Sequence, residues 1–91
     1  MKKVLEKAIE TYGINAQLDV CVEEMSELIK EICKKKRGQN NREAIIEEIA
    51  DVTIMLQQLE MMCDIKPQEV FDVVEIKVKR LKEILENGKK R

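Results

Sequence analysis

The sequence predicts an all-α protein that forms one domain over residues 1–91. Apolar residues recur along most of the chain at spacings of three and four, which places them on one face of a helix. Charged residues make up 38% of the chain and aromatic residues only 2%, a composition typical of helices with hydrated outer faces rather than of strands. A monomer of this length buries only about 60 to 65% of the surface of its unfolded chain, so pairing with another copy would help it to fold.

Two helices are expected in the first half of the chain, over residues 3–11 and 16–36. Gly13 lies where a helix C-terminus favours a left-handed residue, and Asn15 is the expected N-cap of the second helix. The apolar positions of the second helix recur at steps of three and four. They are Leu18, Cys21, Val22, Met25, Leu28, Ile29, Ile32 and Cys33.

A third helix is expected over residues 42–63. Gly38 ends the preceding helix, and Asn40 and Glu43 have the spacing of a capping box at the start of the new one. The apolar residues of this helix form one stripe and also spread well beyond it. A face this wide predicts contacts on two sides, within the fold and with another subunit.

The last helix is expected to begin at Pro67, because proline favours the first helical turn, and to end at the pair Asn87 and Gly88. The tail of residues 89–91 is expected to be frayed. No internal repeat or domain linker is visible, so the four helices are expected to form a single four-helix bundle.

Four carboxylates lie on or beside the apolar faces of the two long helices. At about 100° per residue, Glu48 points from the middle of the apolar face of its helix, and Asp51 lies at the edge of that face. Glu24 and Glu27 repeat this arrangement on the preceding helix. Carboxylates crowded onto facing helices repel one another, and a buried anion is costly if it is left unpaired. We therefore expect a cation between them.

The chemistry of these ligands favours magnesium, with manganese as a substitute. The chain contains no histidine, and carboxylate oxygens alone favour these hard cations over zinc. Magnesium usually shares its coordination with phosphate oxygens, so the expected substrate is a phosphate ester. A ferritin-like di-iron site requires histidine and is excluded. The alternative is that these acids, with Glu23 and Glu31, form ordinary hydrated helix faces.

The sequence resembles the MazG-type nucleotide pyrophosphohydrolases of the all-α nucleoside triphosphate pyrophosphatase superfamily. The family pattern EExxE, followed one helix later by ExxD, is present as EEMSE at residues 23–27 and EIAD at residues 48–51. The likeness extends over roughly residues 12–80. It implies a four-helix fold and hydrolysis of a nucleoside triphosphate between its α and β phosphates, which yields a nucleoside monophosphate and pyrophosphate.

The same resemblance implies a metal site formed by Glu24, Glu27, Glu48 and Asp51. Magnesium in this site would bridge phosphate oxygens, and a carboxylate would orient and deprotonate the attacking water. Glu23 or Glu27 would be that catalytic base. The spacing of the residues does not decide whether Glu27 is a ligand or the base.

Substrate-binding residues are implied less directly. Basic residues of the last core helix contact phosphate in the family, and Lys77 and Arg80 are the nearest match, although Glu75 replaces the family's frequent asparagine. The alternative is that both side chains cover apolar surface with their stems. Gln17 would approach the base or sugar, unless it serves in capping or packing. Residues 34–37 form a basic run that either caps a helix or binds phosphate across a subunit boundary.

The charge balance disfavours nucleic acid as a partner. Seventeen basic against eighteen acidic residues give a net charge of -1, so no overall field draws the chain to nucleic acid or to a membrane. No apolar stretch approaches the roughly 20 residues that cross a bilayer, and the protein is expected to be cytoplasmic. The three cysteines are expected to be reduced thiols in the core.

Two functions are consistent with these patterns. The first is a pyrophosphohydrolase that works as a homodimer or a homotetramer. The second is a catalytically silent helical module for oligomerisation or partner binding. The intact set of four carboxylates favours the enzyme, because a binding module has no need of acids in an apolar face.

Overall fold

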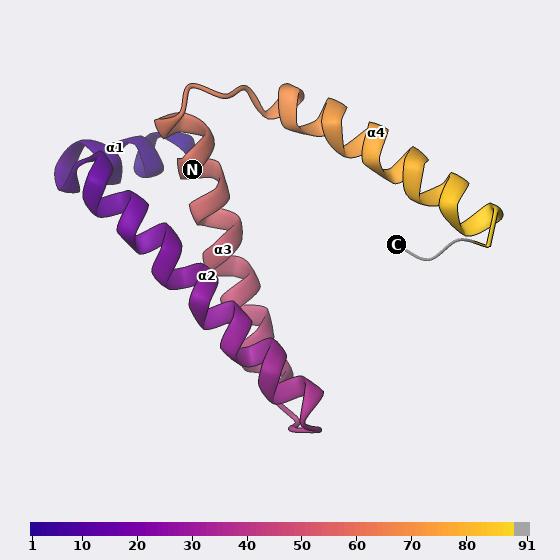
Figure 1. Cartoon of the computed structure of the whole chain (residues 1–91). Coiled ribbons are helices and arrows are strands. Elements are labelled where there is room, and N and C mark those ends of the chain that lie inside the picture. Colours follow the sequence, from indigo (N-terminus) through magenta and orange to yellow (C-terminus); the bar gives the residue numbers. More distant parts are fainter. Residues whose placement is uncertain (89–91) are drawn as a thin grey trace.

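Four helices make up the computed structural model, which describes residues 1–88, and they confirm the all-α prediction. They are α1 (Lys2–Tyr12), α2 (Ile14–Lys36), α3 (Arg42–Met62) and α4 (Pro67–Glu86) (Figure 1). The expected helices differ from these by at most two residues at either end. None of the four combines the length and the apolar character that a bilayer-spanning segment needs. The tail that we expected to be frayed, residues 89–91, lies outside the described residues.

A single glycine joins α1 to α2. Gly13 has a φ of 91°, which favours glycine, and its N–H donates to the carbonyl of Ile9 at 2.8 Å. Its own carbonyl accepts from the N–H of Gln17 at 3.1 Å, so this residue closes both helices. The chain therefore enters α2 at Ile14, and the prediction that Asn15 is the N-cap is wrong.

The turn between α2 and α3 also differs from the expectation. Asn41, not Asn40, directly precedes α3, and no side chain caps the first turn of this helix. The predicted capping box of Asn40 and Glu43 is therefore wrong, because the amide of Asn41 is engaged by α2 instead. At the start of α4 the expectation is confirmed, with Pro67 as the first helical residue.

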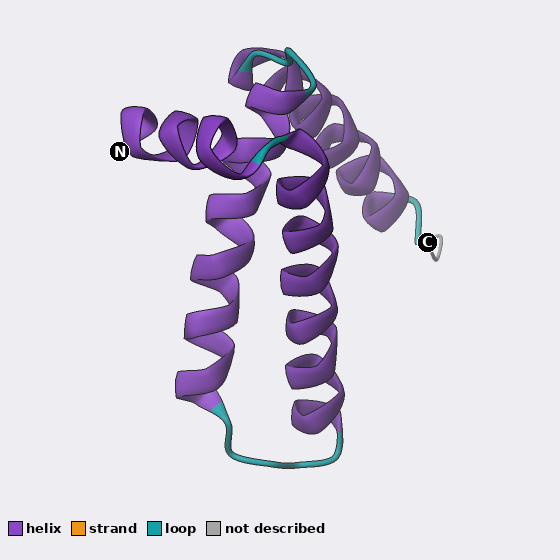
Figure 2. Ribbon diagram, turned by 90° about the vertical axis from the view of Figure 1, so that its left-hand side faces the viewer, coloured by secondary structure: helices purple, strands orange, loops and turns teal. Residues whose placement is uncertain are grey.

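The two long helices pack as an antiparallel hairpin, and α1 crosses one end of it (Figure 2). Cys21 of α2 and Met55 of α3 are buried between the helices, and Leu5 of α1 is buried at the crossing. Cys33 and Cys63 are exposed. The prediction that all three thiols lie in the core is therefore correct only for Cys21.

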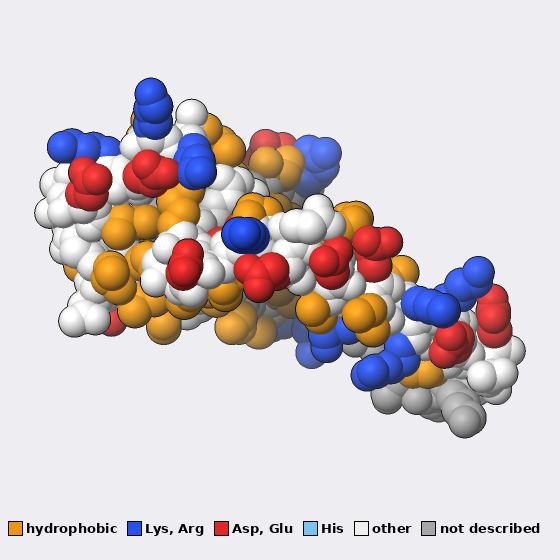
Figure 3. Space-filling view, turned by 90° about the horizontal axis from the view of Figure 1, so that it is seen from above, with side chains coloured by type: hydrophobic (Ala, Val, Ile, Leu, Met, Phe, Trp, Pro, Cys, Tyr) orange, Lys and Arg blue, Asp and Glu red, His pale blue; other side chains and the backbone are white. Residues whose placement is uncertain are grey.

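Helix α4 extends away from the other three helices, and none of its residues is buried. Its apolar side chains, such as Phe71 and Leu85, lie uncovered at 55% and 67% exposure. The space-filling view shows this helix as an arm on which hydrophobic, acidic and basic groups are interspersed (Figure 3). The four predicted helices are present, but α4 does not close a compact bundle within one chain.

Candidate metal centre

The middle of the hairpin brings three carboxylates together. Glu24 comes from α2, whereas Glu48 and Asp51 come from α3, and one oxygen of each lies within 4.8 Å of the other two. Residues three apart are neighbours on a helix surface, which is why Glu48 and Asp51 approach the same point. All three side chains are half-buried. We call Glu24, Glu48 and Asp51 the acidic triad.

Mutual repulsion and burial shift the pKa of two triad members. A hydrogen bond with Asp51 is the largest cause that raises the pKa of Glu24, and burial and the charge of Asp51 add to it. Burial is the largest cause that raises the pKa of Glu48, followed by the charges of Asp51 and Glu27. No ion pair within residues 1–88 involves a triad carboxylate. The triad is therefore a place where positive charge is favoured.

One triad oxygen also lacks any hydrogen-bond partner. The Oε2 atom of Glu48 is buried and accepts no hydrogen bond from the described residues. Buried acceptors are almost always paired, so an unpaired oxygen on a carboxylate of this triad needs a donor or a cation. Three converging carboxylates suit Mg²⁺ or Mn²⁺, and Glu24, Glu48 and Asp51 are the residues that could hold such an ion.

The remaining predicted acids flank the triad without joining it. Glu27 is exposed, but its charge contributes to the raised pKa of Glu48. Glu23 is also exposed, and its charge contributes to the raised pKa of Glu24. The structure thus groups three of the four expected ligands and leaves Glu23 and Glu27 beside them, open to solvent.

One end of the hairpin holds a buried acid with a different environment. Glu31 is only 8% exposed, and its Oε1 accepts a hydrogen bond from the amide of Asn41 at 2.8 Å, while Lys34 lies 3.2 Å from Oε2. These partners lower the pKa of Glu31, Asn41 first and Lys34 second. Glu31 is therefore not part of a hydrated face. A signal for this was present, because Glu31 follows Glu24 by seven residues and so shares its side of α2.

The other end of the hairpin holds Gln17, which we expected to approach a base or sugar. The structure buries it, and its Nε2 donates to Oε1 of Gln58 at 2.7 Å. The Nε2 of Gln58 in turn donates to the carbonyl of Leu5 at 3.2 Å. This chain of bonds fastens α1 to the hairpin, so here Gln17 has a packing role. Sequence analysis missed Gln58, although it follows Asp51 by seven residues.

The predicted phosphate-binding residues lie elsewhere. Lys77 and Arg80 are on α4, where they line a shallow hollow together with Val74, Val78, Leu81 and Ile84. Helix α4 does not pack on the centre of the hairpin, so one chain does not bring these two side chains to the acidic triad (Figure 1).

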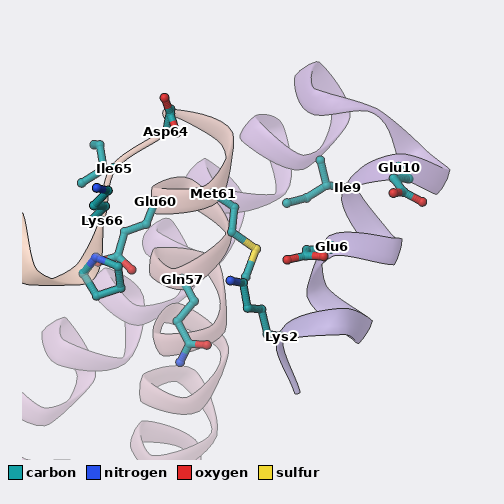
Figure 4. A pocket seen from close by; sticks show the side chains of 11 residues that line it. Lys2, Glu6, Ile9, Glu10, Gln57, Glu60, Met61, Asp64, Ile65 and Lys66 are labelled. Atoms are coloured by element: carbon teal, nitrogen blue, oxygen red, sulfur yellow. The ribbon is translucent and has the colours of Figure 1, made fainter.

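A separate open groove of about 860 Å³ lies where α1 meets the C-terminal end of α3. Figure 4 shows Met61 of α3 pointing toward α1, with Lys2 and Glu6 across from it. No triad residue lines this groove. The acidic site and the groove are therefore distinct features of the hairpin.

Comparisons with known proteins found no matching family model, no matching curated protein and no matching solved structure.

Proposed function

We propose that this chain is a cytoplasmic, magnesium-dependent pyrophosphohydrolase of the MazG-like type. It would cleave nucleoside triphosphates between the α and β phosphates to a nucleoside monophosphate and pyrophosphate. The observation that carries this proposal is the buried, unpartnered oxygen of Glu48 within a triad of carboxylates from two facing helices. The likeness of residues 23–27 and 48–51 to the family's paired acidic motifs supports the substrate class.

The positions of the acids support the roles that we propose for them. Glu24, Glu48 and Asp51 would hold Mg²⁺, or Mn²⁺ in its place, and Glu27 would be the fourth ligand that the family resemblance implies. Bound there, the ion would neutralise charge on the phosphate oxygens. Glu23 or Glu27, which lie exposed beside the triad, would accept a proton from the attacking water. As the water oxygen bonds to the α or the β phosphorus, the bond from that phosphorus to the α–β bridging oxygen would break. The nucleoside monophosphate and pyrophosphate would then separate.

Lys77 and Arg80 would bind the phosphate groups of the nucleoside triphosphate. Because α4 stands apart from the triad within one chain, these side chains would reach the site from another copy. Assembly as a homodimer or a homotetramer meets this requirement. The net charge of -1 favours such a small anionic substrate, held by a few local cations, over nucleic acid.

The test is release of pyrophosphate from a panel of standard and modified nucleoside triphosphates with Mg²⁺. Glu48→Gln and Asp51→Asn should each reduce the rate by about 100-fold or more, because each removes a carboxylate that holds the ion. Glu47→Gln is the matched control, since this neighbour is exposed and outside the triad, and it should keep the wild-type rate.

Two results would contradict the proposal. If the wild-type chain releases no pyrophosphate from any member of the panel, the alternative of a catalytically silent oligomerisation or partner-binding module replaces it. If Glu48→Gln and Glu47→Gln have equal activity, the acidic triad is not the reaction site.

A further inference from the structure

Two hydrogen-bonded pairs of polar side chains join α2 to α3, one on each side of the acidic triad. In the first pair, Nε2 of Gln17 donates to Oε1 of Gln58 at 2.7 Å. In the second, the amide of Asn41 donates to Oε1 of Glu31 at 2.8 Å. Asn41 belongs to the first turn of α3, because its carbonyl accepts from the N–H of Ile45 at 3.0 Å. We call Gln17 and Gln58 the Gln clamp, and Glu31 and Asn41 the Asn clamp.

Every clamp residue lies seven residues from a triad residue along the chain. These pairs are Gln17 and Glu24, Glu24 and Glu31, Asn41 and Glu48, and Asp51 and Gln58. Seven residues are about two helical turns, so residues at this spacing lie on one side of a helix, about 10 Å apart. The step between the Gln clamp and the triad is equal on both helices. The Gln clamp and the hydrogen bond between Glu24 and Asp51 therefore require the same register of α2 against α3.

The apolar residues between the two helices do not fix this register by themselves. Cys21 and Met55 are buried between the Gln clamp and the triad, but apolar contact has no direction and can form in more than one register. A buried polar side chain, in contrast, can fix the register of paired helices. Gln58 is only 2% exposed, so after a slip it would remain buried without its partner, which is costly.

Further contacts hold each clamp in place. The Nε2 of Gln58 also donates to the carbonyl of Leu5 at 3.2 Å, so α1 fixes the Gln clamp. The amide of Asn41 also donates to the carbonyl of Glu31 at 2.9 Å, and Nζ of Lys34 lies 3.2 Å from Oε2 of the same glutamate. Neither clamp is therefore a single loose contact.

The acidic triad works against the register that the clamps hold. One oxygen of each triad carboxylate lies within 4.8 Å of the other two, so in the cation-free protein their repulsion favours a slip or a separation of the helices. A clamp about two turns away on either side opposes both movements. Ligands that are already in place when a cation arrives lose little freedom on binding, which favours tight binding.

We propose that the Gln clamp and the Asn clamp are positioning residues that set the register of α2 against α3, so that the acidic triad converges on one cation. The clamp side chains do not themselves bind the ion. The inference rests on the cation site of the proposed function, but not on turnover of a substrate. It assigns a role in metal binding to residues that lie about two turns from the metal ligands.

The test separates stability from metal affinity. The double variant Gln17→Met/Gln58→Met replaces both partners by apolar side chains of similar size, so the melting temperature should stay close to that of the wild-type protein. The dissociation constant for Mn²⁺ should nevertheless rise by about 10-fold or more, the effect of removing groups that orient metal ligands. Electron paramagnetic resonance of free Mn²⁺ measures this constant at a temperature at which circular dichroism shows every variant to be folded.

The matched control is Gln57→Met, which makes the same chemical change at the neighbouring residue and should keep the wild-type affinity. A merely structural clamp would change stability and affinity together. Wild-type affinity in the double variant would therefore overturn the inference. If the double variant does not fold, the Asn clamp decides: Asn41→Ala should weaken Mn²⁺ binding and Asn40→Ala should not. Equal affinities in these two variants would equally overturn it.

A second measurement needs neither metal nor substrate. Spin labels at Asp19→Cys and Glu47→Cys, in a chain with Cys33→Ser and Cys63→Ser, report the register by pulsed electron resonance, because both positions are exposed and on different helices. Asp19 lies near the Gln clamp and Glu47 near the triad, so a slip of one turn changes their separation. Labelled chains are diluted with unlabelled ones to remove distances between copies.

The unmodified clamps should give one narrow distance distribution in a chelating buffer, and Gln17→Met/Gln58→Met should broaden or shift it. Identical distributions would overturn the inference even if the wild-type protein bound no Mn²⁺. Mn²⁺ binding that depends on the clamps, without release of pyrophosphate, would contradict the proposed reaction and support the inference.

Discussion

Three glutamates of the hairpin show that contacts, rather than residue type, determine how a carboxylate behaves. Glu31 has the Asn41 amide and Lys34 as partners, and they lower its pKa. Glu24 and Glu48 face other carboxylates and are partly buried, and their pKa values are raised. The charge of Glu31 at one end of the hairpin is therefore compensated by its partners, whereas the charges of Glu24 and Glu48 in the middle are not. A cation in the middle would remove this difference.

These shifts predict how the stability of the metal-free protein changes with pH. A raised pKa means that the folded state binds protons more readily than the unfolded state, so stability should increase as the pH falls from neutral toward the usual value of 4.5. Below that value the lowered pKa of Glu31 acts in the opposite direction, and stability should fall. Thermal melting in a chelating buffer should therefore give a higher melting temperature at about pH 5 than at about pH 7.5.

The control for this prediction is a pair of variants. Glu48→Gln removes one of the titrating groups and should clearly reduce the pH dependence. Glu47→Gln should reduce it much less, because the charge of Glu47 is the smallest of the named contributions to the raised pKa of Glu48. A melting temperature that rises steadily from acid to neutral pH would contradict the assigned shifts.

The helices themselves were largely predictable, because the spacing of apolar residues and the positions of Gly13, Gly38 and Pro67 are local signals. The triad was predictable in part, because Glu48 interrupts an apolar face. Long-range partners were not predictable. Gln58 lies 41 residues from Gln17, and their contact depends on the register between α2 and α3, which a single helix does not encode.

The turn between α2 and α3 offers a direct test of the finding that Asn41, and not a capping box of Asn40 and Glu43, holds the start of α3. Asn41→Ala removes the bonds from its amide to the carboxylate and the backbone carbonyl of Glu31, at 2.8 and 2.9 Å. We expect the melting temperature to fall by about 4 to 8 °C or more, because the loss of these two hydrogen bonds should cost about 1 kcal/mol or more in a domain of this size. Asn40→Ala should change it by less than about 2 °C.

Circular dichroism at a fixed protein concentration measures both melting temperatures. A larger loss of melting temperature for Asn40→Ala than for Asn41→Ala would contradict this expectation. It would support the capping box that the sequence predicted. It would also show that the contact between Asn41 and Glu31 does not hold the turn.

At the scale of the whole molecule, the position of α4 could not be predicted. Its periodicity shows that one face is apolar, but not what covers that face, and among residues 1–88 no residue of α4 is buried. The spacing of apolar residues along one helix does not say whether another copy or another protein covers such a face. The acidic triad could be predicted in part without knowledge of a partner, because both of its helices belong to one chain.

The central claim is that the triad binds a divalent cation, and thermal melting of the whole protein with Mg²⁺ or Mn²⁺ tests it most directly. The ion would join α2 to α3, so binding should stabilise the entire fold. At a concentration about 100-fold above the dissociation constant, the melting temperature should rise by about 10 °C or more. At matched ionic strength and protein concentration, Glu47→Gln should retain this rise and Glu48→Gln should lose it. A flat response of the wild-type protein to both ions, or an equal rise in both variants, would contradict the claim.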